Sequence, residues 1–103
     1  MIGLQSKRKS EETMMNTSYL EVTYRQGRAI AAYYYLPRRP GQRSVRTQRA
    51  VGGLLIDYAR GGRPIGVEIT SPGTISVAVF NRVLRELGFP PVTREDVAPL
   101  IAA

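Results

Sequence analysis

Apolar and polar residues follow a two-residue period in the first half of the chain and a helical period in its last third. The segment L-E-V-T-Y at 20–24 alternates strictly, which predicts a strand with one apolar face. R-Q-G-R at 25–28 is a turn, because its glycine can take a positive φ, and I-A-A-Y-Y-Y-L at 30–36 returns from it. Both faces of 30–36 are fairly apolar, so we expect this strand to be central or covered on both sides.

A further strand is predicted over residues 44–51, after a loop at 37–43 that contains two prolines and a glycine. Its segment, S-V-R-T-Q-R-A-V, carries Val45, Thr47 and Arg49 on one side. The charged side chains favour an edge position, because arginine on an outer strand discourages pairing with another chain.

The most regular segment is L-L-I-D-Y-A-R-G-G-R-P-I-G-V-E-I at 54–69, which predicts a β-hairpin. If Gly61 and Gly62 form a primed two-residue turn, the apolar side chains of both strands fall on one face. The opposed pairs are then Tyr58 with Ile65, Ile56 with Val67 and Leu54 with Ile69, and the other face holds Leu55, Asp57, Gly66 and Glu68. Pro64 suits an edge or a bulge, and a four-residue turn would keep the same residues facing inward.

The period becomes helical after S-P-G at 71–73. The apolar stripe of this helix consists of Phe80, Val83, Leu84 and Leu87. Thr74 or Ser76 is suited to cap its N-terminus, and Gly88 suits the position just after its C-terminus.

A second, short helix is predicted after F-P-P-V at 89–92, because Thr93 and Asp96 form a variant of the capping box. The expected fold class is therefore α+β. It is a small antiparallel meander sheet of four to five strands, followed by one amphipathic helix and a short C-terminal helix.

Residues 1–18 lack periodicity and are expected to be a flexible tail, with Met14 or Met15 as an alternative start. Residues 19–103 are expected to be a single domain, because a chain of 103 residues has room for one small core. No apolar run reaches the roughly 20 residues that a membrane-spanning helix needs. We therefore expect no membrane association and a cytoplasmic location.

The chain contains no cysteine and no histidine. This composition excludes disulfides, thiolate nucleophiles and histidine general bases, and it removes the usual ligands of structural zinc. We expect no cofactor, no metal and no catalytic residue, and hence a protein that is not an enzyme.

Asp57 and Glu68 are the one pair of carboxylates that resembles catalytic machinery. In the expected register they are diagonal neighbours about 7–8 Å apart, close to the separation of a glycosidase pair. They lie on the polar side of a hairpin with no evident cleft, where solvation or cross-strand pairing with arginine is the simpler role. The glycines around them match neither phosphate-binding pattern and serve turn geometry.

The formal net charge of +7 is compatible with an acidic partner such as nucleic acid, or with genomic base composition alone. Five positive charges without an intervening acid follow the tyrosine run at 33–35. The possible nucleic-acid or partner contacts are Arg38, Arg39, Arg43, Arg46 and Arg49, with Tyr33 and Tyr35. A solvated loop and edge strand is the competing interpretation, and no helix-turn-helix or RNP-type pattern is present.

From Tyr19 onward the chain resembles the family called domain of unknown function 2283, which consists of small uncharacterised bacterial proteins. The resemblance is carried by V-T-Y at 22–24, A-Y-Y-Y-L at 32–36, G-L-L-I-D-Y at 53–58, G-R-P-I-G-V-E-I at 62–69, N-R-V-L-R-E-L-G-F-P-P at 81–91 and E-D-V-A-P-L at 95–100. It implies a small α+β protein without an assigned activity, and some relatives are suspected parts of toxin–antitoxin-like loci. The chain departs from the family where members have acidic turns, since Arg25–Arg28 and Ala59–Gly61 stand there.

Two functional expectations follow. The first is a non-enzymatic interaction or regulatory module, expected to be a homodimer or to have a protein partner, because the apolar faces of residues 30–36 need cover. The alternative is a nucleic-acid-binding protein that uses the basic segment Arg38–Arg49.

Overall fold

The computed structural model describes residues 17–101, so the tail predicted over residues 1–18 lies almost wholly outside the described part. The strands are β2 (Tyr19–Arg25), β3 (Arg28–Tyr35), β4 (Arg46–Arg49), β5 (Leu54–Tyr58) and β6 (Pro64–Ile69). The helices are α1 (Val77–Glu86) and α2 (Ala98–Ile101), with 3₁₀ turns η2 (Val51–Gly53) and η3 (Pro72–Thr74).

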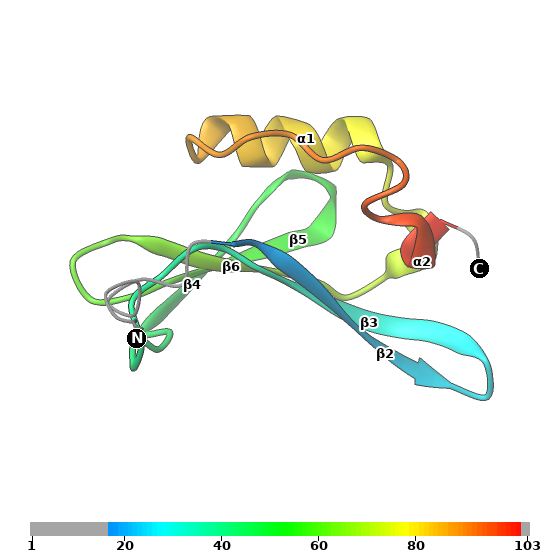
Figure 1. Cartoon of the computed structure of the whole chain (residues 1–103), viewed down its shortest axis with the longest axis horizontal. Coiled ribbons are helices and arrows are strands. Elements are labelled where there is room, and N and C mark those ends of the chain that lie inside the picture. The colour runs from blue at the N-terminus through cyan, green and yellow to red at the C-terminus, as the bar shows by residue number, and fades with distance from the viewer. Residues whose placement is uncertain (1–16, 102–103) are drawn as a thin grey trace, which may run out of the picture.

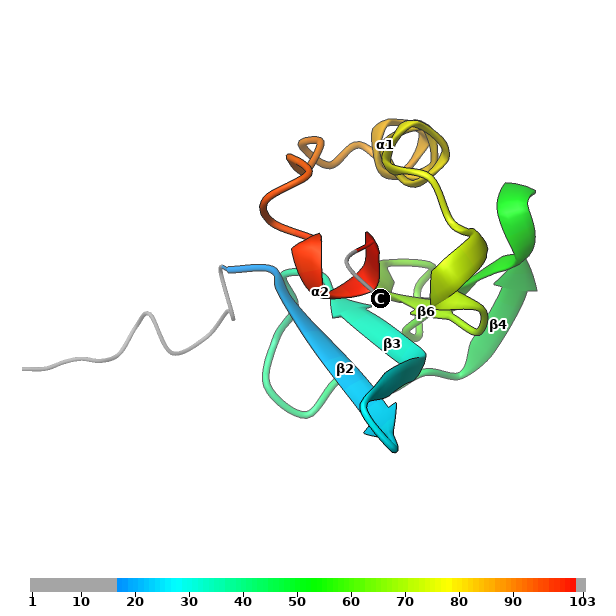
Figure 2. The ribbon, with the colours of Figure 1, turned by 90° about the vertical axis from the view of Figure 1, so that its right-hand side faces the viewer.

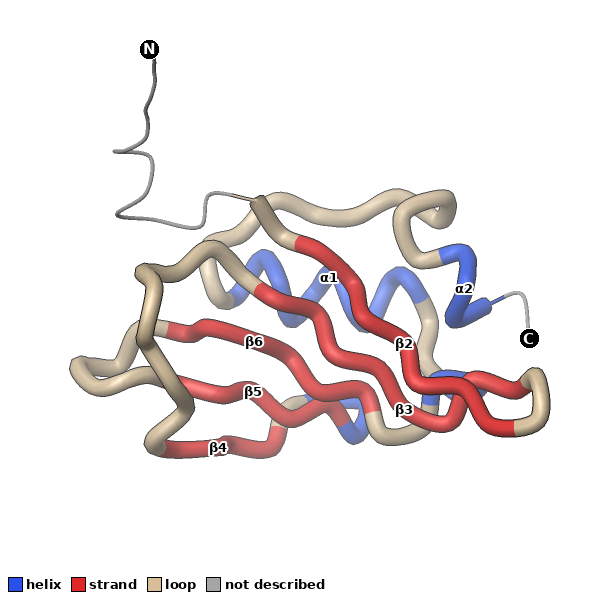
Figure 3. The backbone as a smooth tube through the Cα atoms, turned by 60° about the horizontal axis from the view of Figure 1, so that its bottom comes forward, coloured by secondary structure: helices blue, strands red, loops and turns tan. Residues whose placement is uncertain are grey.

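The five strands form one antiparallel sheet in the order β2-β3-β6-β5-β4 (Figure 3). The order is meander-like: β2 and β3 form one hairpin, β4, β5 and β6 follow one another as a meander, and β6 rather than β4 lies beside β3. The α+β class is confirmed, and β4 is an outer strand as its charges predicted. β2 and β3 are joined by a two-residue turn in which Gln26 and Gly27 both have positive φ, 51° and 78°, as a type I′ turn requires.

The register predicted for β5 and β6 is correct along most of the hairpin. Leu54 pairs with Ile69 and Ile56 with Val67, but Tyr58 pairs with Pro64 and not with Ile65. The difference is a bulge after Asp57, because proline has no amide hydrogen to donate to the ladder. The turn is correspondingly longer than the two glycines alone, and the Ala59 amide donates to the Arg63 carbonyl at 2.8 Å.

Both helices lie on the same face of the sheet (Figures 1 and 2). The core between the layers joins apolar side chains of the sheet to those of the helices. Its buried members are Ala32, Leu36, Leu54, Ile56, Val67, Ile69, Phe80, Val83, Leu84, Val92, Val97 and Leu100. The expectation that β3 is central or covered on both sides is met by its first alternative. It is an internal strand, but within residues 17–101 no helix covers its second face.

Capping residues determine where the helices begin. The Val79 amide donates to Ser76 Oγ at 3.1 Å, so Ser76 and not Thr74 is the N-cap of α1. Gly88 follows the helix with a φ of 87°. The predicted capping box before α2 is present in both directions: Thr93 N donates to Asp96 Oδ2 at 2.9 Å, and Asp96 N donates to Thr93 Oγ1 at 3.1 Å.

Asn81 connects α1 to the segment that follows it. Its amide nitrogen donates to the Val92 carbonyl at 2.9 Å, and its amide oxygen accepts from the Val92 amide at 2.7 Å. This side chain, which lies outside the apolar stripe of the helix, therefore holds the extended segment against α1. Over residues 17–101 we find no helix long and apolar enough to cross a membrane.

Candidate functional site

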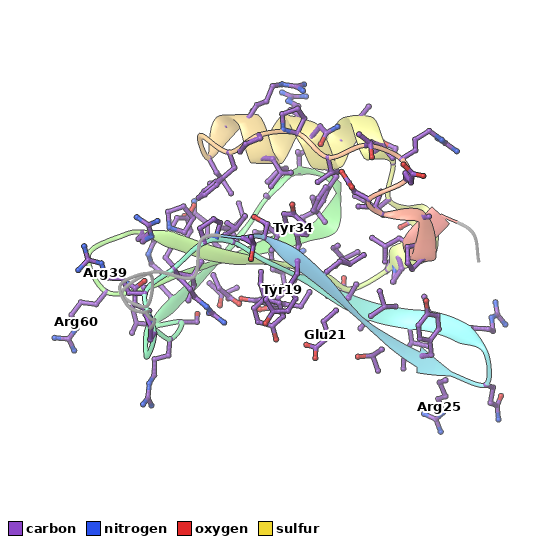
Figure 4. All side chains as sticks on the ribbon, in the orientation of Figure 1. Tyr19, Glu21, Arg25, Tyr34, Arg39 and Arg60 are labelled. Atoms are coloured by element: carbon purple, nitrogen blue, oxygen red, sulfur yellow. The ribbon has the colours of Figure 1, made fainter. Side chains whose placement is uncertain are left out.

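The helix-free face of the sheet carries a cluster of tyrosines, of which Tyr19 is labelled in Figure 4. Successive residues of a strand point to opposite faces, so Tyr34 packs edge-on against Phe80 of α1 while Tyr33 and Tyr35 point away from the helices. Tyr35 stacks on Tyr19 with the ring centroids 4.4 Å apart, and Tyr33 meets it edge-on at 4.6 Å. The cluster joins the first two strands on the side that no helix of the described chain covers.

Asp57 lies beneath this cluster and is only 5% exposed. Its side chain accepts a hydrogen bond from Thr47 Oγ1 on β4, and Tyr33 Oη on β3 donates to its Oδ2 at 2.8 Å. The expectation that Asp57 is either solvated or paired with an arginine across the strands is therefore wrong. Neutral hydroxyls hold Asp57 inside the sheet, one from the neighbouring β4 and one from β3, which lies beyond β6.

Gly66 makes this arrangement possible. It lies directly opposite Asp57 in the β5–β6 pairing, and the Tyr33 ring crosses over it. A Cβ atom at this position would lie 2.0 Å from Tyr33 Oη. The glycine is therefore required by a close approach and not by turn geometry.

Asp57 and Glu68 lie on the same face, as the register predicted, and they form an interacting pair. Burial acts to raise the pKa of Asp57, but hydrogen bonds from Thr47 and Tyr33 outweigh it and hold the pKa below its usual range. Burial, together with the neighbouring Asp57, raises the pKa of Glu68. Burial and the hydrogen bond to Asp57 likewise raise the pKa of Tyr33.

Asp57 and Glu68 belong to an internal hydrogen-bonded network. A depression of about 220 Å³ lies beside it, lined by Glu21, Thr23, Ala31, Tyr33 and Glu68 among others. No group of metal-binding side chains occurs in the described range 17–101. The prediction of no catalytic residue stays a prediction; what the geometry shows is that the hydroxyls of Thr47 and Tyr33 hold Asp57 in place.

The structure separates the five arginines of the predicted basic surface. Arg38 lies over the Tyr35 ring at 5.1 Å on the helix-free face, while Arg46 lies over the Tyr58 ring at 4.1 Å. Arg49 is opposite Leu55 near the other end of β4. Arg39 and Arg43 belong to the loop between β3 and β4.

The loop after β3 lies against the β5–β6 turn, and this adds two arginines that the sequence pattern did not suggest. A depression of about 400 Å³ is lined by Gln42 and Arg43 from the loop and by Ala59 and Arg60 from the turn. Arg63 Nη2 donates to the Pro37 carbonyl at 3.4 Å. Figure 4 shows Arg39 and Arg60 together at this end of the molecule. The sequence could not predict this proximity, because residues 43 and 60 are brought together only by the tertiary structure.

The β2–β3 hairpin projects beyond the rest of the sheet. β3 pairs with β6 only from Ala32 onward, so the part of β3 before Ala32 has only β2 beside it in the sheet. Tyr24, expected on the core face with Leu20 and Val22, is 54% exposed, and Ile30 is 46% exposed. Leu20 and Val22 do pack against the core, so the strand leaves the covered area before it ends.

A scan against protein-family models finds no match to this chain, and searches of curated proteins and of solved structures find none either. The resemblance to domain of unknown function 2283 therefore stays a prediction. The fold and the surfaces described above are the basis for any functional conclusion.

Proposed function

We propose that this protein is a non-enzymatic interaction module that works as a homodimer. The observation that supports this proposal is the projecting β2–β3 hairpin (Figure 1), on which Tyr24 and Ile30 are exposed and which no helix of residues 17–101 covers. Two-stranded ribbons are marginally stable in water, and a ribbon with large exposed apolar side chains gains stability when a partner covers it.

The helix-free face adds to this support. Its tyrosines and carboxylates bond to one another and leave few groups aimed at a small substrate, as the Tyr33–Asp57 and Tyr35–Glu21 contacts illustrate. A surface of this kind contributes shape and aromatic area to an interface, in which tyrosine and arginine are enriched.

The test is the mass of the full chain by light scattering over a concentration series that reaches the high micromolar range. We expect the mass to rise toward twice 11.4 kDa. A protein that remains monomeric at every concentration would overturn the homodimer.

The second candidate function is binding to nucleic acid through the loop end. The observation that favours it is the approach of the β5–β6 turn to the loop after β3, which brings Arg60 to the same depression as Arg43. Arg43 is flanked along the sequence by Arg39 and Arg46, and Arg63 follows Arg60 in the turn; phosphate contacts of arginine depend strongly on salt.

Retention on an immobilised polyanion measures this second function. We expect the double variant Arg39→Ala/Arg60→Ala to elute at clearly lower salt than Arg85→Ala/Arg94→Ala, which removes the same charge from exposed positions elsewhere. An equal loss of retention in the two variants would show that retention depends only on net charge, and the loop end would then have no special role.

A further inference from the structure

The two outer strands of the sheet differ in how they meet solvent. β4 is four residues long, is exposed throughout and carries Arg46 and Arg49 with no acid of its own. A second copy of β4 beside it would place arginines near arginines, and such strands are protected from pairing. β2 is seven residues long and contains both Glu21 and Arg25. It is the outer strand that lacks this protection.

We infer that β2 pairs antiparallel with β2 of a second copy, about a twofold axis through Thr23. This inference rests on the proposed homodimer and specifies its interface. The paired segment is E-V-T-Y-R at 21–25, whose chemistry is self-complementary when read against itself in the opposite direction.

The pairing with β3 determines the face of the sheet to which each side chain of β2 points. Thr23 pairs with Ala31 and Tyr24 with Ala29, so the extra residue at the bulge is Ile30 on β3. The alternation along β2 is therefore unbroken. Glu21 and Arg25 point to the helix-free side together with Tyr19, as Figure 4 shows.

In the proposed register Glu21 lies opposite Arg25 of the partner, and Thr23 lies opposite itself. On the helix side Val22 lies opposite the partner's Tyr24, which covers a tyrosine that is 54% exposed in the single chain. Opposed side chains of an antiparallel pair have Cβ atoms about 4.5–5.5 Å apart, close enough for two ion pairs and two apolar contacts per dimer.

Neighbouring registers are less favourable. An axis through Glu21 sets two glutamates against each other, and like charges directly opposite are destabilising. An axis through Val22 places Glu21 opposite Thr23 and leaves the ion pairs diagonal. A slip of one residue would set apolar side chains against polar ones.

The existing contacts of Glu21 and Arg25 fit this role. Tyr35 Oη donates to Glu21 Oε1 at 2.8 Å and so orients the carboxylate on the helix-free side. Among residues 17–101 the structure pairs Arg25 with no carboxylate. A closed pair of identical strands is isologous, which is the commonest symmetry of soluble dimers.

A charge exchange tests the inference. Arg25→Glu sets two glutamates opposite two glutamates, and we expect the dimer dissociation constant to rise about tenfold or more, the factor that corresponds to about 1.4 kcal/mol. Glu21→Arg/Arg25→Glu restores opposite charges in every pair and is expected to return the constant to within about threefold of the original. Arg28→Glu is the matched control, with the same change of charge on the same ribbon but on β3.

A cross-link tests the register itself. The chain has no cysteine, so Thr23→Cys introduces the only thiol. The two introduced thiols face each other across the axis, within the Cα separation of about 4.4–6.8 Å that a disulfide requires, and mild oxidation should give a covalent dimer. Tyr19→Cys, whose two copies lie far from each other in this register, should remain uncross-linked.

The outcomes separate the inference from the proposed function. An original chain that is monomeric throughout overturns both. A chain that dimerises while the charge exchange gives no rescue and Thr23→Cys gives no cross-link keeps the homodimer, and it shows that β2 pairing is wrong and that another surface holds the copies together.

Discussion

The two faces of the sheet use the same residue type in opposite ways. On the covered face Tyr34 packs against Phe80, and its position is maintained by burial among apolar side chains. On the helix-free face Tyr33 is held by a hydrogen bond to Asp57 and by the space that Gly66 leaves. The first arrangement depends on area removed from water and the second on a few directed contacts. The two faces should therefore respond differently to substitution, pH and salt.

The largest expected effect is on the covered face. Phe80 is 2% exposed, and Phe80→Ala should lower the free energy of unfolding by about 3–5 kcal/mol, because the lost burial is compounded by a cavity. Urea denaturation followed by circular dichroism measures the change. Val51→Ala, at an exposed position, is the control and should stay within about 0.5 kcal/mol.

The next effect is the removal of space on the helix-free face. Gly66→Ala forces the Tyr33 ring away from Asp57, and we expect a loss of about 2 kcal/mol, the value of a hydrogen bond to a charged group. Gly73→Ala is the matched control, because a Cβ atom there meets nothing within 4 Å. A Gly66→Ala protein as stable as the original would show that the tyrosine network adds little.

A smaller effect separates the two tyrosines of this face. Tyr33→Phe removes the donor to a buried carboxylate and should cost about 1.5 kcal/mol. Tyr35→Phe removes the donor to the exposed Glu21 and should cost about 0.5 kcal/mol or less. Thermal unfolding of both variants under the same conditions gives the comparison, and equal losses would contradict it.

The smallest effect is a dependence of the free energy of unfolding on pH that arises from Asp57 and Glu68 on the helix-free face. Because the pKa of Asp57 is lowered in the folded protein, this carboxylate contributes to the free energy of unfolding above its ordinary pKa. That contribution is lost as the pH falls through the lowered value. The raised pKa of Glu68 gives the opposite dependence on pH. Its contribution to the free energy of unfolding is present at low pH and is lost as the pH rises from 4.5 through the raised value.

Glu68→Gln keeps a side chain that can donate to Asp57 and removes the charge. We expect the free energy of unfolding near neutral pH to rise by up to about 1 kcal/mol, because repulsion between the two carboxylates is relieved. The decline of the original protein above pH 4.5 should be absent in the variant. Chemical denaturation at a series of pH values tests this, and parallel pH profiles for the two proteins would refute it.

The covered face was predictable from the sequence because burial leaves a periodic signal. Leu54, Ile56, Val67 and Ile69 alternate along their strands, and this pattern specified both the face and most of the register. The bulge at Tyr58 was not specified, since Pro64 was compatible with more than one turn. The helix N-cap was left between two residues for a similar reason.

The helix-free face was not predictable in the same way. The hydroxyl of Tyr33 meets Asp57 from a strand that precedes it by many residues, and no periodicity records such a contact. Arg60 shares a depression with Arg43 for a similar reason. Alternation sorts side chains by face, but it does not say which polar groups on that face will meet.

The two hydrogen bonds between Asn81 and Val92 have a consequence for how the molecule opens. The segment from Val92 to Leu100 contributes three buried side chains to the core, yet it adds no strand to the sheet. Its release would therefore leave every backbone ladder intact. We expect the amide hydrogens of this segment to exchange with solvent together and faster than those of β5 and β6. The local opening begins when the hydrogen bonds between Asn81 and Val92 break.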